Sequence, residues 1–161
     1  MKKIISSALL LVLMWAGYSQ AEPVIDEDTL RSISAELIEA ATDGNVAPFK
    51  KYLYEGSEMV VDLDPSPSAG EMAISYDEYV PLLEMAIPMM KGADLHVEVL
   101  SVSIDEAANE GTIREKSTSV MEMMGTKIRD VSISESTYGV VNGQIKLLRA
   151  SDQVLSSGPV Q

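Results

Sequence analysis

The chain has 161 residues, no cysteine and a single histidine, and its 25 acidic and 12 basic side chains give a formal net charge of −13. This excess of carboxylates argues against binding to nucleic acid or anionic lipid, because phosphate groups attract Lys and Arg. The lack of cysteine excludes disulfides, thiolate nucleophiles and thiolate zinc sites, and the single His96 excludes a histidine-rich metal site within one chain.

The first 21 residues have the pattern of a secretory signal peptide. Two lysines precede an apolar stretch from Ala8 to Trp15, and Ser19-Gln20-Ala21 supplies the small residues that a signal peptidase accepts. The apolar stretch is too short to cross about 30 Å of hydrocarbon as a helix, which disfavours an uncleaved membrane anchor. We expect a periplasmic protein, or alternatively a fully secreted one, with no membrane anchor after cleavage. Its mature domain would span residues 22–155, with a flexible tail over 156–161.

Three helices are expected in the first half of this domain. Between Asp26 and Thr42, apolar residues recur at spacings of three and four, and Asp43-Gly44-Asn45 ends the pattern with turn residues. A short helix from Val46 to Tyr54 follows, and a third helix is expected from Tyr76 to Met90. Because proline lacks a backbone N–H, Pro88 predicts a break or kink near the end of the third helix.

The remaining segments predict strands separated by turns. These strands are Glu58 to Asp64, Glu71 to Ile74, Leu95 to Asp105, Thr112 to Met124, Lys127 to Val141 and Gln144 to Leu155. Asn142-Gly143 is the strongest hairpin signal, since both residues tolerate positive φ. In the strand from Leu95, the apolar residues change from odd to even positions at Val99-Leu100. A β-bulge or burial on both faces would explain the change, and strong curvature of the sheet is the simpler interpretation.

This order of elements resembles the nuclear transport factor 2-like superfamily, which includes SnoaL-like cyclases, ketosteroid isomerases and dehydratases. The resemblance rests on the apolar stripe from Leu30 to Ala41, the Asp43-Gly44-Asn45 turn into Phe49, the strand from Glu58 to Asp64 and the terminal four-stranded meander. It implies an α+β domain in which a cone-shaped, curved antiparallel sheet packs on three N-terminal helices and leaves a pocket at its wide end. It also implies a homodimer formed through the outer face of the sheet.

The leading hypothesis for function is an exported domain that binds a small apolar or amphipathic molecule in the cone. Methionine is flexible and polarizable, which suits an adaptable apolar pocket, although ordinary core packing explains the same residues. The candidate ligand-binding residues are Tyr52, Tyr79, Met85, Met89, Met121 and Met123. We expect no metal and no cofactor.

The second hypothesis is an isomerase, dehydratase or cyclase. The resemblance implies an Asp or His general base in an apolar pocket, often with a Tyr that donates to a developing oxyanion, and the candidate bases here are Asp62 and His96. A solvated strand end for Asp62 and a surface position for His96 are the structural alternatives. A carboxyl group with a raised pKa facing a Tyr hydroxyl would favour the enzyme, whereas a pocket lined only by Met, Leu and Val would favour binding. A protein-interaction domain is the third hypothesis.

Two of the predicted strands have a serine-rich face. The strand from Thr112 carries Glu115, Ser117 and Ser119 on one face, and the next strand carries Asp130, Ser132, Ser134 and Ser136. Val131 and Ile133 lie on the opposite face of that second strand. Such serine-rich faces are usually solvated sheet surface, but the resemblance makes a dimer face equally possible, and the sequence does not choose between the two.

Overall fold

The computed structural model of the protein describes residues 22–62, 71–123 and 125–160, so the predicted signal peptide and Asp64 lie outside it. The described helices are α2 (Glu27–Asp43), α3 (Ala47–Tyr52) and α4 (Tyr76–Met89). The strands are β1 (Glu58–Asp62), β2 (Met72–Ile74), β3 (Asp94–Asp105), β4 (Glu110–Met123), β5 (Thr126–Val141) and β6 (Gln144–Pro159). Across the described ranges, the helices are too short or too polar to cross a membrane.

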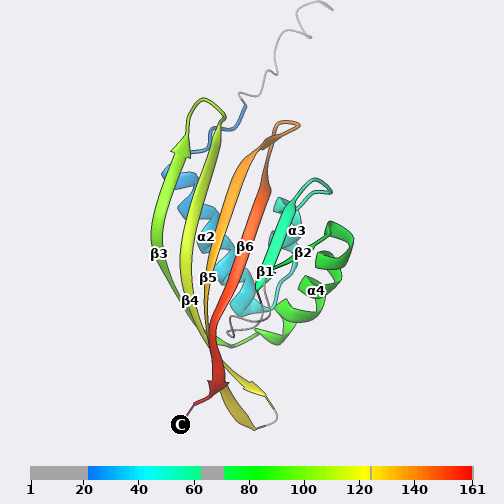
Figure 1. Ribbon diagram of the computed structural model, residues 1–161, viewed down its shortest axis with the longest axis vertical. Coiled ribbons are helices and arrows are strands. Elements are labelled where there is room, and N and C mark those ends of the chain that lie inside the picture. The colour runs from blue at the N-terminus through cyan, green and yellow to red at the C-terminus, as the bar shows by residue number, and fades with distance from the viewer. Residues whose placement is uncertain (1–21, 63–70, 124, 161) are drawn as a thin grey trace, which may run out of the picture.

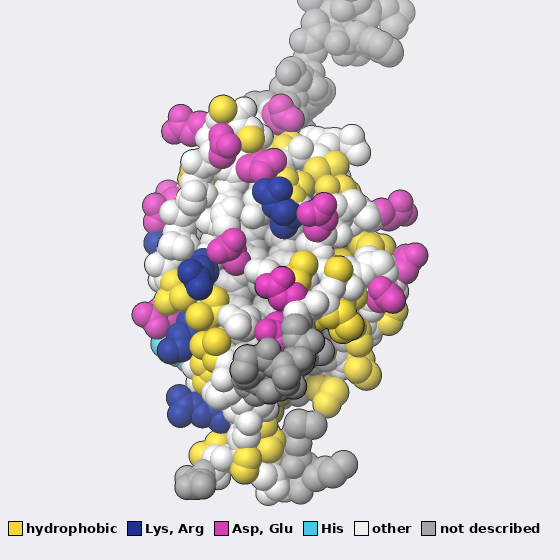
Figure 2. Space-filling model, viewed as in Figure 1, with side chains coloured by type: hydrophobic (Ala, Val, Ile, Leu, Met, Phe, Trp, Pro, Cys, Tyr) yellow, Lys and Arg dark blue, Asp and Glu magenta, His cyan; other side chains and the backbone are white. Residues whose placement is uncertain are grey.

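The strands form a single curved sheet in the order β2-β1-β6-β5-β4-β3. Its inner face packs on the helices, and its outer face is turned toward the viewer in Figure 1. Figure 2 shows the same outer face, over which acidic side chains are spread. This architecture confirms the predicted α+β fold. The sheet is mixed rather than wholly antiparallel, because β1 runs parallel to β6 while the other neighbouring strands run antiparallel.

The curvature of the sheet has a local cause in β-bulges. The pairing of β3 with β4 shifts register between Val99 and Ser101, so a bulge, one of the explanations considered for Val99-Leu100, accompanies the change of apolar face. Leu100 is the extra residue and is 43% exposed, while Val99 and Val102 both pack against the core. Two further register shifts interrupt the pairing of β5 with β6. Because each bulge bends its strand and increases the local twist, the long strands curve around α2.

The first helix begins and ends as its sequence specifies. The side chain of Asp26 caps α2 by accepting a hydrogen bond from the backbone N–H of Thr29 at 2.7 Å. At the other end, Gly44 has φ 70° and donates its N–H to carbonyl groups of the last turn. This left-handed conformation favours glycine, so α2 stops where the Asp43-Gly44-Asn45 turn was expected.

The core is concentrated where the first half of α2 meets the start of β4. Leu30 and Ile113 are the largest fully buried side chains of the described residues. Gly111 permits this close approach, because a Cβ at that position would lie 2.6 Å from Ile25 Cγ2 and 2.8 Å from Leu30 Cδ1. The cone is therefore narrow and filled at this end.

The end of β6 differs from its predicted position, whereas the end of α4 lies close to its predicted position. β6 continues to Pro159, beyond the expected end at Leu155, because its last residues pair with residues 128–131 of β5. Pro88 lies in the last turn of α4, which ends one residue later at Met89, close to the predicted break. A proline there removes one backbone donor from a turn that is ending in any case.

The contact at Gly111 predicts a site-specific loss of stability. Gly111→Ala would force a methyl group against Ile25 and Leu30, and we expect it to lower the free energy of unfolding by about 1–3 kcal/mol. Gly158→Ala is the matched control, since nothing lies within 4 Å of a Cβ built at that strand position. Urea denaturation of both variants measures the difference. Equal effects of the two substitutions would contradict the proposed steric role of Gly111.

Candidate functional site

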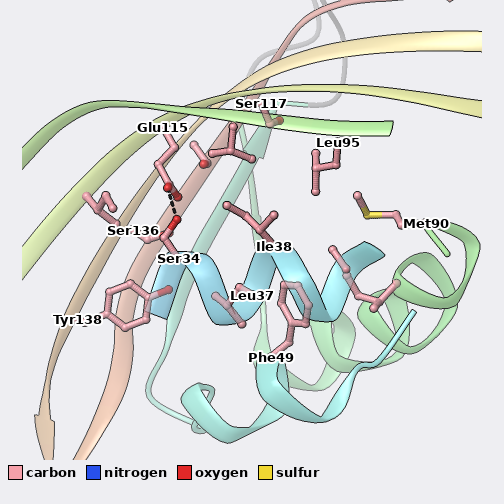
Figure 3. A pocket seen from close by; sticks show the side chains of 15 residues that line it. Ser34, Leu37, Ile38, Phe49, Met90, Leu95, Glu115, Ser117, Ser136 and Tyr138 are labelled. Atoms are coloured by element: carbon pink, nitrogen blue, oxygen red, sulfur yellow. Dashed lines mark hydrogen bonds between the residues drawn. The ribbon is translucent and has the colours of Figure 1, made fainter. Parts of the chain in front are cut away.

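A cavity separates the second half of α2 from the inner face of the sheet. Its first compartment has a volume of about 240 Å³ (Figure 3). The apolar lining residues are Leu37, Ile38, Ala41, Phe49, Ile87, Met90, Leu95, Val97 and Ile113. The polar lining residues are Ser34, Glu115, Ser117, Ser134, Ser136 and Tyr138. The helical wall is therefore hydrocarbon except for Ser34, and the sheet supplies the other polar residues together with Leu95, Val97 and Ile113.

A second compartment of about 520 Å³ continues the first along the inner face of the sheet. The two compartments share Met90, Leu95, Ser117, Ser134 and Ser136. The second is additionally lined by Tyr79, Ser119, Met121, Asp130, Ser132, Ala150, Ser151, Asp152, Val154 and Ser157. Because of the shared residues, we treat both compartments as one cavity and call it the cone pocket.

Strand register places three polar side chains side by side on the floor of the cone pocket. Glu115 of β4 pairs with Ser134 of β5, and Ser134 pairs with Asp152 of β6. Since neighbouring strands lie about 4.8 Å apart, the two carboxyl groups flank the serine from either side. We call Glu115, Ser134 and Asp152 the polar row.

At one end of the polar row, Glu115 connects the sheet to α2. Ser34 of α2 donates its hydroxyl to Glu115 Oε1 at 2.5 Å (Figure 3). Tyr138 lies nearby, and burial together with the charge of Glu115 raises the pKa of Tyr138. Its ring stands edge-on to Tyr52, with 5.9 Å between the ring centroids. The phenol of Tyr138 thus keeps its proton and is held in place.

At the other end of the polar row, Asp152 lies close to Tyr79. Burial raises the pKa of Asp152, and a hydrogen bond from Ser132 partly opposes that rise. Burial and the nearby Asp152 raise the pKa of Tyr79 to about 12. The pair therefore combines a carboxyl group of raised proton affinity with a phenol that keeps its proton.

Asp130 adds a third carboxyl group to the cone pocket. Its Oδ1 atom is buried and has no hydrogen-bond partner among the described residues. Buried polar atoms in folded proteins are nearly always paired, so an unpaired carboxylate oxygen in a cavity wall is unusual. It gives the second compartment an unused acceptor.

The predicted ligand-binding residues fall into different places. Tyr79 and Met121 line the second compartment. Tyr52 is buried in the core, where its hydroxyl donates to Glu36 at 2.5 Å. Met85 and Met89 are 61% and 58% exposed on α4. Met123 belongs to β4, but its side chain lies outside the described set.

Neither predicted general base lies in the cone pocket. His96 alternates with Leu95 and Val97, which line the pocket, and it is exposed on the outer face of the sheet. Asp62 pairs with Gln153 of β6 and lines another groove, of about 310 Å³, which also includes Arg114 and Glu135 and which meets the second compartment at Ser151 and Asp152. The structure therefore places both residues away from the pocket floor.

The serine-rich faces were wrongly interpreted as solvated surface or a dimer face, because they line the cone pocket. Strict alternation along a strand separates two faces but does not say which one faces the helices. Serines on the inner face leave space that larger apolar side chains would fill. Glu115 and Asp152 were missed as functional candidates for the same reason, and the signal for Glu115 was its place among those serines.

Comparison with known proteins supports the fold and goes no further. No family model matches the chain, and no curated protein matches it. A nuclear transport factor 2-like protein with a cystatin-like fold from Novosphingobium aromaticivorans matches at 16% identity and TM-score 0.60, over 97% of this chain and 92% of that one. A scytalone dehydratase-like protein from the same organism matches at 15% identity and TM-score 0.61, over 94% and 90%.

A third solved structure, a hexachlorocyclohexane dehydrochlorinase from Novosphingobium barchaimii, matches at 10% identity and TM-score 0.61, over 81% of this chain and 87% of that one. The three similar structures agree on the architecture while their sequences differ widely from this one. The chain has the nuclear transport factor 2-like fold, which confirms the resemblance seen in the sequence. A shared fold does not transfer an activity.

The raised pKa of Asp152 predicts a pH-dependent gain in stability for Asp152→Asn. In the folded state this carboxyl group holds its proton to higher pH than in the unfolded state, where the ordinary value of 3.8 applies. Stability therefore falls as the pH rises from the unfolded pKa through the folded pKa, and the full cost is present above both. We expect the asparagine variant to melt at a higher temperature near pH 7, with the gain shrinking toward about pH 4.

Thermal melts followed by circular dichroism at several pH values measure this difference. Glu135→Gln is the matched control, because it also removes one carboxylate but at an exposed position on β5. A gain of equal size in the control would assign the effect to net charge rather than to the burial of Asp152.

Proposed function

We propose that this protein is an exported domain that binds a small amphipathic molecule in the cone pocket. The observation that carries the proposal is the two-sided lining of one continuous cavity, with hydrocarbon on the helical wall and the polar row on the sheet. The second compartment, about 520 Å³, lies within the range of known small-molecule sites, about 300–1,000 Å³, and the first, about 240 Å³, lies just below it. Export is proposed from the signal-peptide pattern of residues 1–21.

The two walls specify how such a molecule would lie. Its apolar part would contact Leu37, Ile38 and Phe49, which the helices bring to the first compartment. Its polar part would face the sheet, where the Tyr79 hydroxyl lies close to Asp152 and where Asp130 Oδ1 has no hydrogen-bond partner among the described residues. Satisfying a buried polar group removes a desolvation cost of about 1–3 kcal/mol, so these atoms favour a ligand with polar groups at one end.

We also propose that two copies of the chain form a homodimer through the outer face of the sheet. Val131 and Ile133 alternate with pocket-lining residues of β5 and therefore lie on the outer face of the sheet. Leu155 of β6 is 42% exposed. Apolar side chains on the outer face of a strand whose inner face is serine-rich favour a partner that covers them, and a second copy of the chain is the partner that the fold suggests.

Methyl resonances of methionine provide a direct test of binding. Met90 and Met121 line the cone pocket, whereas Met85 and Met89 are exposed on α4. Titration of the mature protein with 1-octanol, a neutral amphipathic probe, is expected to shift the Met90 and Met121 signals saturably. The Met85 and Met89 signals should stay in place, and the measurement is a carbon–proton correlation spectrum of methyl-labelled protein.

A pair of adjacent substitutions on β5 locates the site. Ser134→Phe places a ring in the shared part of the cone pocket, and we expect it to weaken octanol binding by about tenfold or more, a loss of at least about 1.4 kcal/mol. Ile133→Phe puts the same ring on the outer face and should leave binding unchanged. Binding that survives Ser134→Phe, or no saturable shift in the wild-type protein, would contradict the proposed function.

An enzyme is the second candidate, and one observation favours it. Asp152 has a raised pKa beside the protonated hydroxyl of Tyr79, which is the combination that suits a general base and an oxyanion donor. The catalytic alternative therefore moves from Asp62 and His96 to this pair. A carboxylate desolvated in a pocket accepts a proton more readily than one in water, so proton abstraction from carbon is the reaction class to test.

5-Nitrobenzisoxazole is a suitable probe, because removal of the proton on C3 of its isoxazole ring breaks the N–O bond, forms a nitrile and releases a coloured cyanophenolate. If Asp152 is a general base, Asp152→Asn should lower the rate by about 10²-fold or more. Glu135→Gln, which changes the outer face, should retain the wild-type rate. A wild-type rate no faster than that of the asparagine variant would exclude this role for Asp152.

A further inference from the structure

We propose that the molecule bound in the cone pocket carries a positively charged amine at its polar end, held at the polar row. This inference rests on the proposed binding function and specifies the charge of the ligand.

The cone pocket is lined by acidic side chains and, among the described residues, by no basic ones. Glu115, Asp130 and Asp152 line it, whereas no Lys, Arg or His is among the described residues that do so. An anionic ligand such as a carboxylate or a phosphate ester would enter a cavity of low dielectric constant lined by like charges, which is strongly unfavourable. The acidic lining of the cone pocket therefore disfavours anionic ligands.

The two basic side chains in the middle of β4 point away from the cone pocket. Arg114 and Lys116 alternate along β4 with Ile113, Glu115 and Ser117, which line the first compartment. They consequently lie on the outer face of the sheet, where Figure 2 shows Lys and Arg side chains.

The ion pairs found within the described ranges join other residues. They are Arg31 with Glu27, Lys50 with Glu84, Lys51 with Glu36 and Arg149 with Glu110. None of these pairs includes a carboxyl group of the cone pocket. Its three acidic side chains are therefore left without a cationic partner from the described part of the protein.

The floor of the cone pocket presents acceptors that match the donors of an ammonium group. Glu115 and Asp152 flank Ser134 on adjacent strands, so an amine above the serine would lie between two carboxyl groups. Asp130 Oδ1 is an unused acceptor, and the Tyr79 oxygen can accept as well as donate. An ammonium ion has three donors and no acceptor, which fits a surface made of carboxylates and hydroxyls.

Aromatic rings add a second source of attraction for a cation. Phe49 and Tyr138 line the first compartment and Tyr79 lines the second. The face of an aromatic ring attracts an ammonium group, and the attraction grows when water is excluded. The ligand class is therefore a primary or substituted amine with an apolar body, held by carboxylates and rings together.

Three probes of equal length test the charge of the ligand. Octylammonium, 1-octanol and octanoate share one alkyl chain and differ in the head group, and isothermal titration at neutral pH measures the dissociation constant of each. We expect octylammonium to bind about tenfold or more tightly than octanol, and octanoate to bind more weakly than octanol. Shifts of the Met90 and Met121 methyl signals establish that the binding occurs in the cone pocket.

Charge-neutral variants identify the carboxyl groups responsible. Asp152→Asn and Glu115→Gln keep the shape of the polar row, and each should reduce the preference for octylammonium over octanol by about threefold or more while octanol still binds. Glu135→Gln removes a charge from the outer face and should leave the preference intact. Retained octanol binding also shows that the two pocket variants are folded.

The results of these titrations distinguish a failure of the charge inference from a failure of the proposed binding function. Equal affinity for octylammonium and octanol, tighter binding of octanoate, or a preference lost equally in Glu135→Gln would overturn the charge inference and leave pocket binding in place. Failure of all three probes to shift Met90 and Met121 would overturn the proposed binding function as well. A preference that falls only in the two pocket variants supports the inference.

Discussion

The close contact between the first turns of α2 and the start of β4 determines the rest of this structure. Gly111 removes a side chain from the contact, so Ile25 and Leu30 reach the sheet and form a filled core. From there the sheet curves, aided by bulges in β3 and in the β5–β6 pair. Further along, the inner face carries serines instead of large apolar side chains. A cavity follows, because these short side chains cannot fill the space beneath α2.

Much of the fold can be predicted from local signals, since helices and hairpins are specified by residues close in sequence. The Asn142-Gly143 turn and the change of apolar face at Val99-Leu100 both appear in the structure as predicted. The parallel pairing of β1 with β6 was not predicted. Strand periodicity says which side chains share a face, but it does not identify a partner strand far away in the sequence.

The site is harder to predict than the fold, because it depends on which face of the sheet is turned toward the helices. The serines of β5 and the apolar Val131 and Ile133 form two clean faces, and an ordinary rule assigns the polar face to solvent. Here the polar face is turned inward, because it lines a cavity instead of a packed core. The methionines show the same difficulty: Met121 lines the cone pocket and Met85 lies on the surface, although both belong to similar sequence clusters.

The position of β6 has a consequence for how the chain can assemble. The final strand is an interior strand, with β1 on one side and β5 on the other. Residues as distant as Glu58 and Arg149 are paired, so β1 and β2 have no place in the sheet until the last strand is available. Pairings of such large sequence separation form slowly, since a long loop must first be closed. A chain emerging from the ribosome therefore cannot complete its sheet until β6 (Gln144–Pro159) has been synthesised.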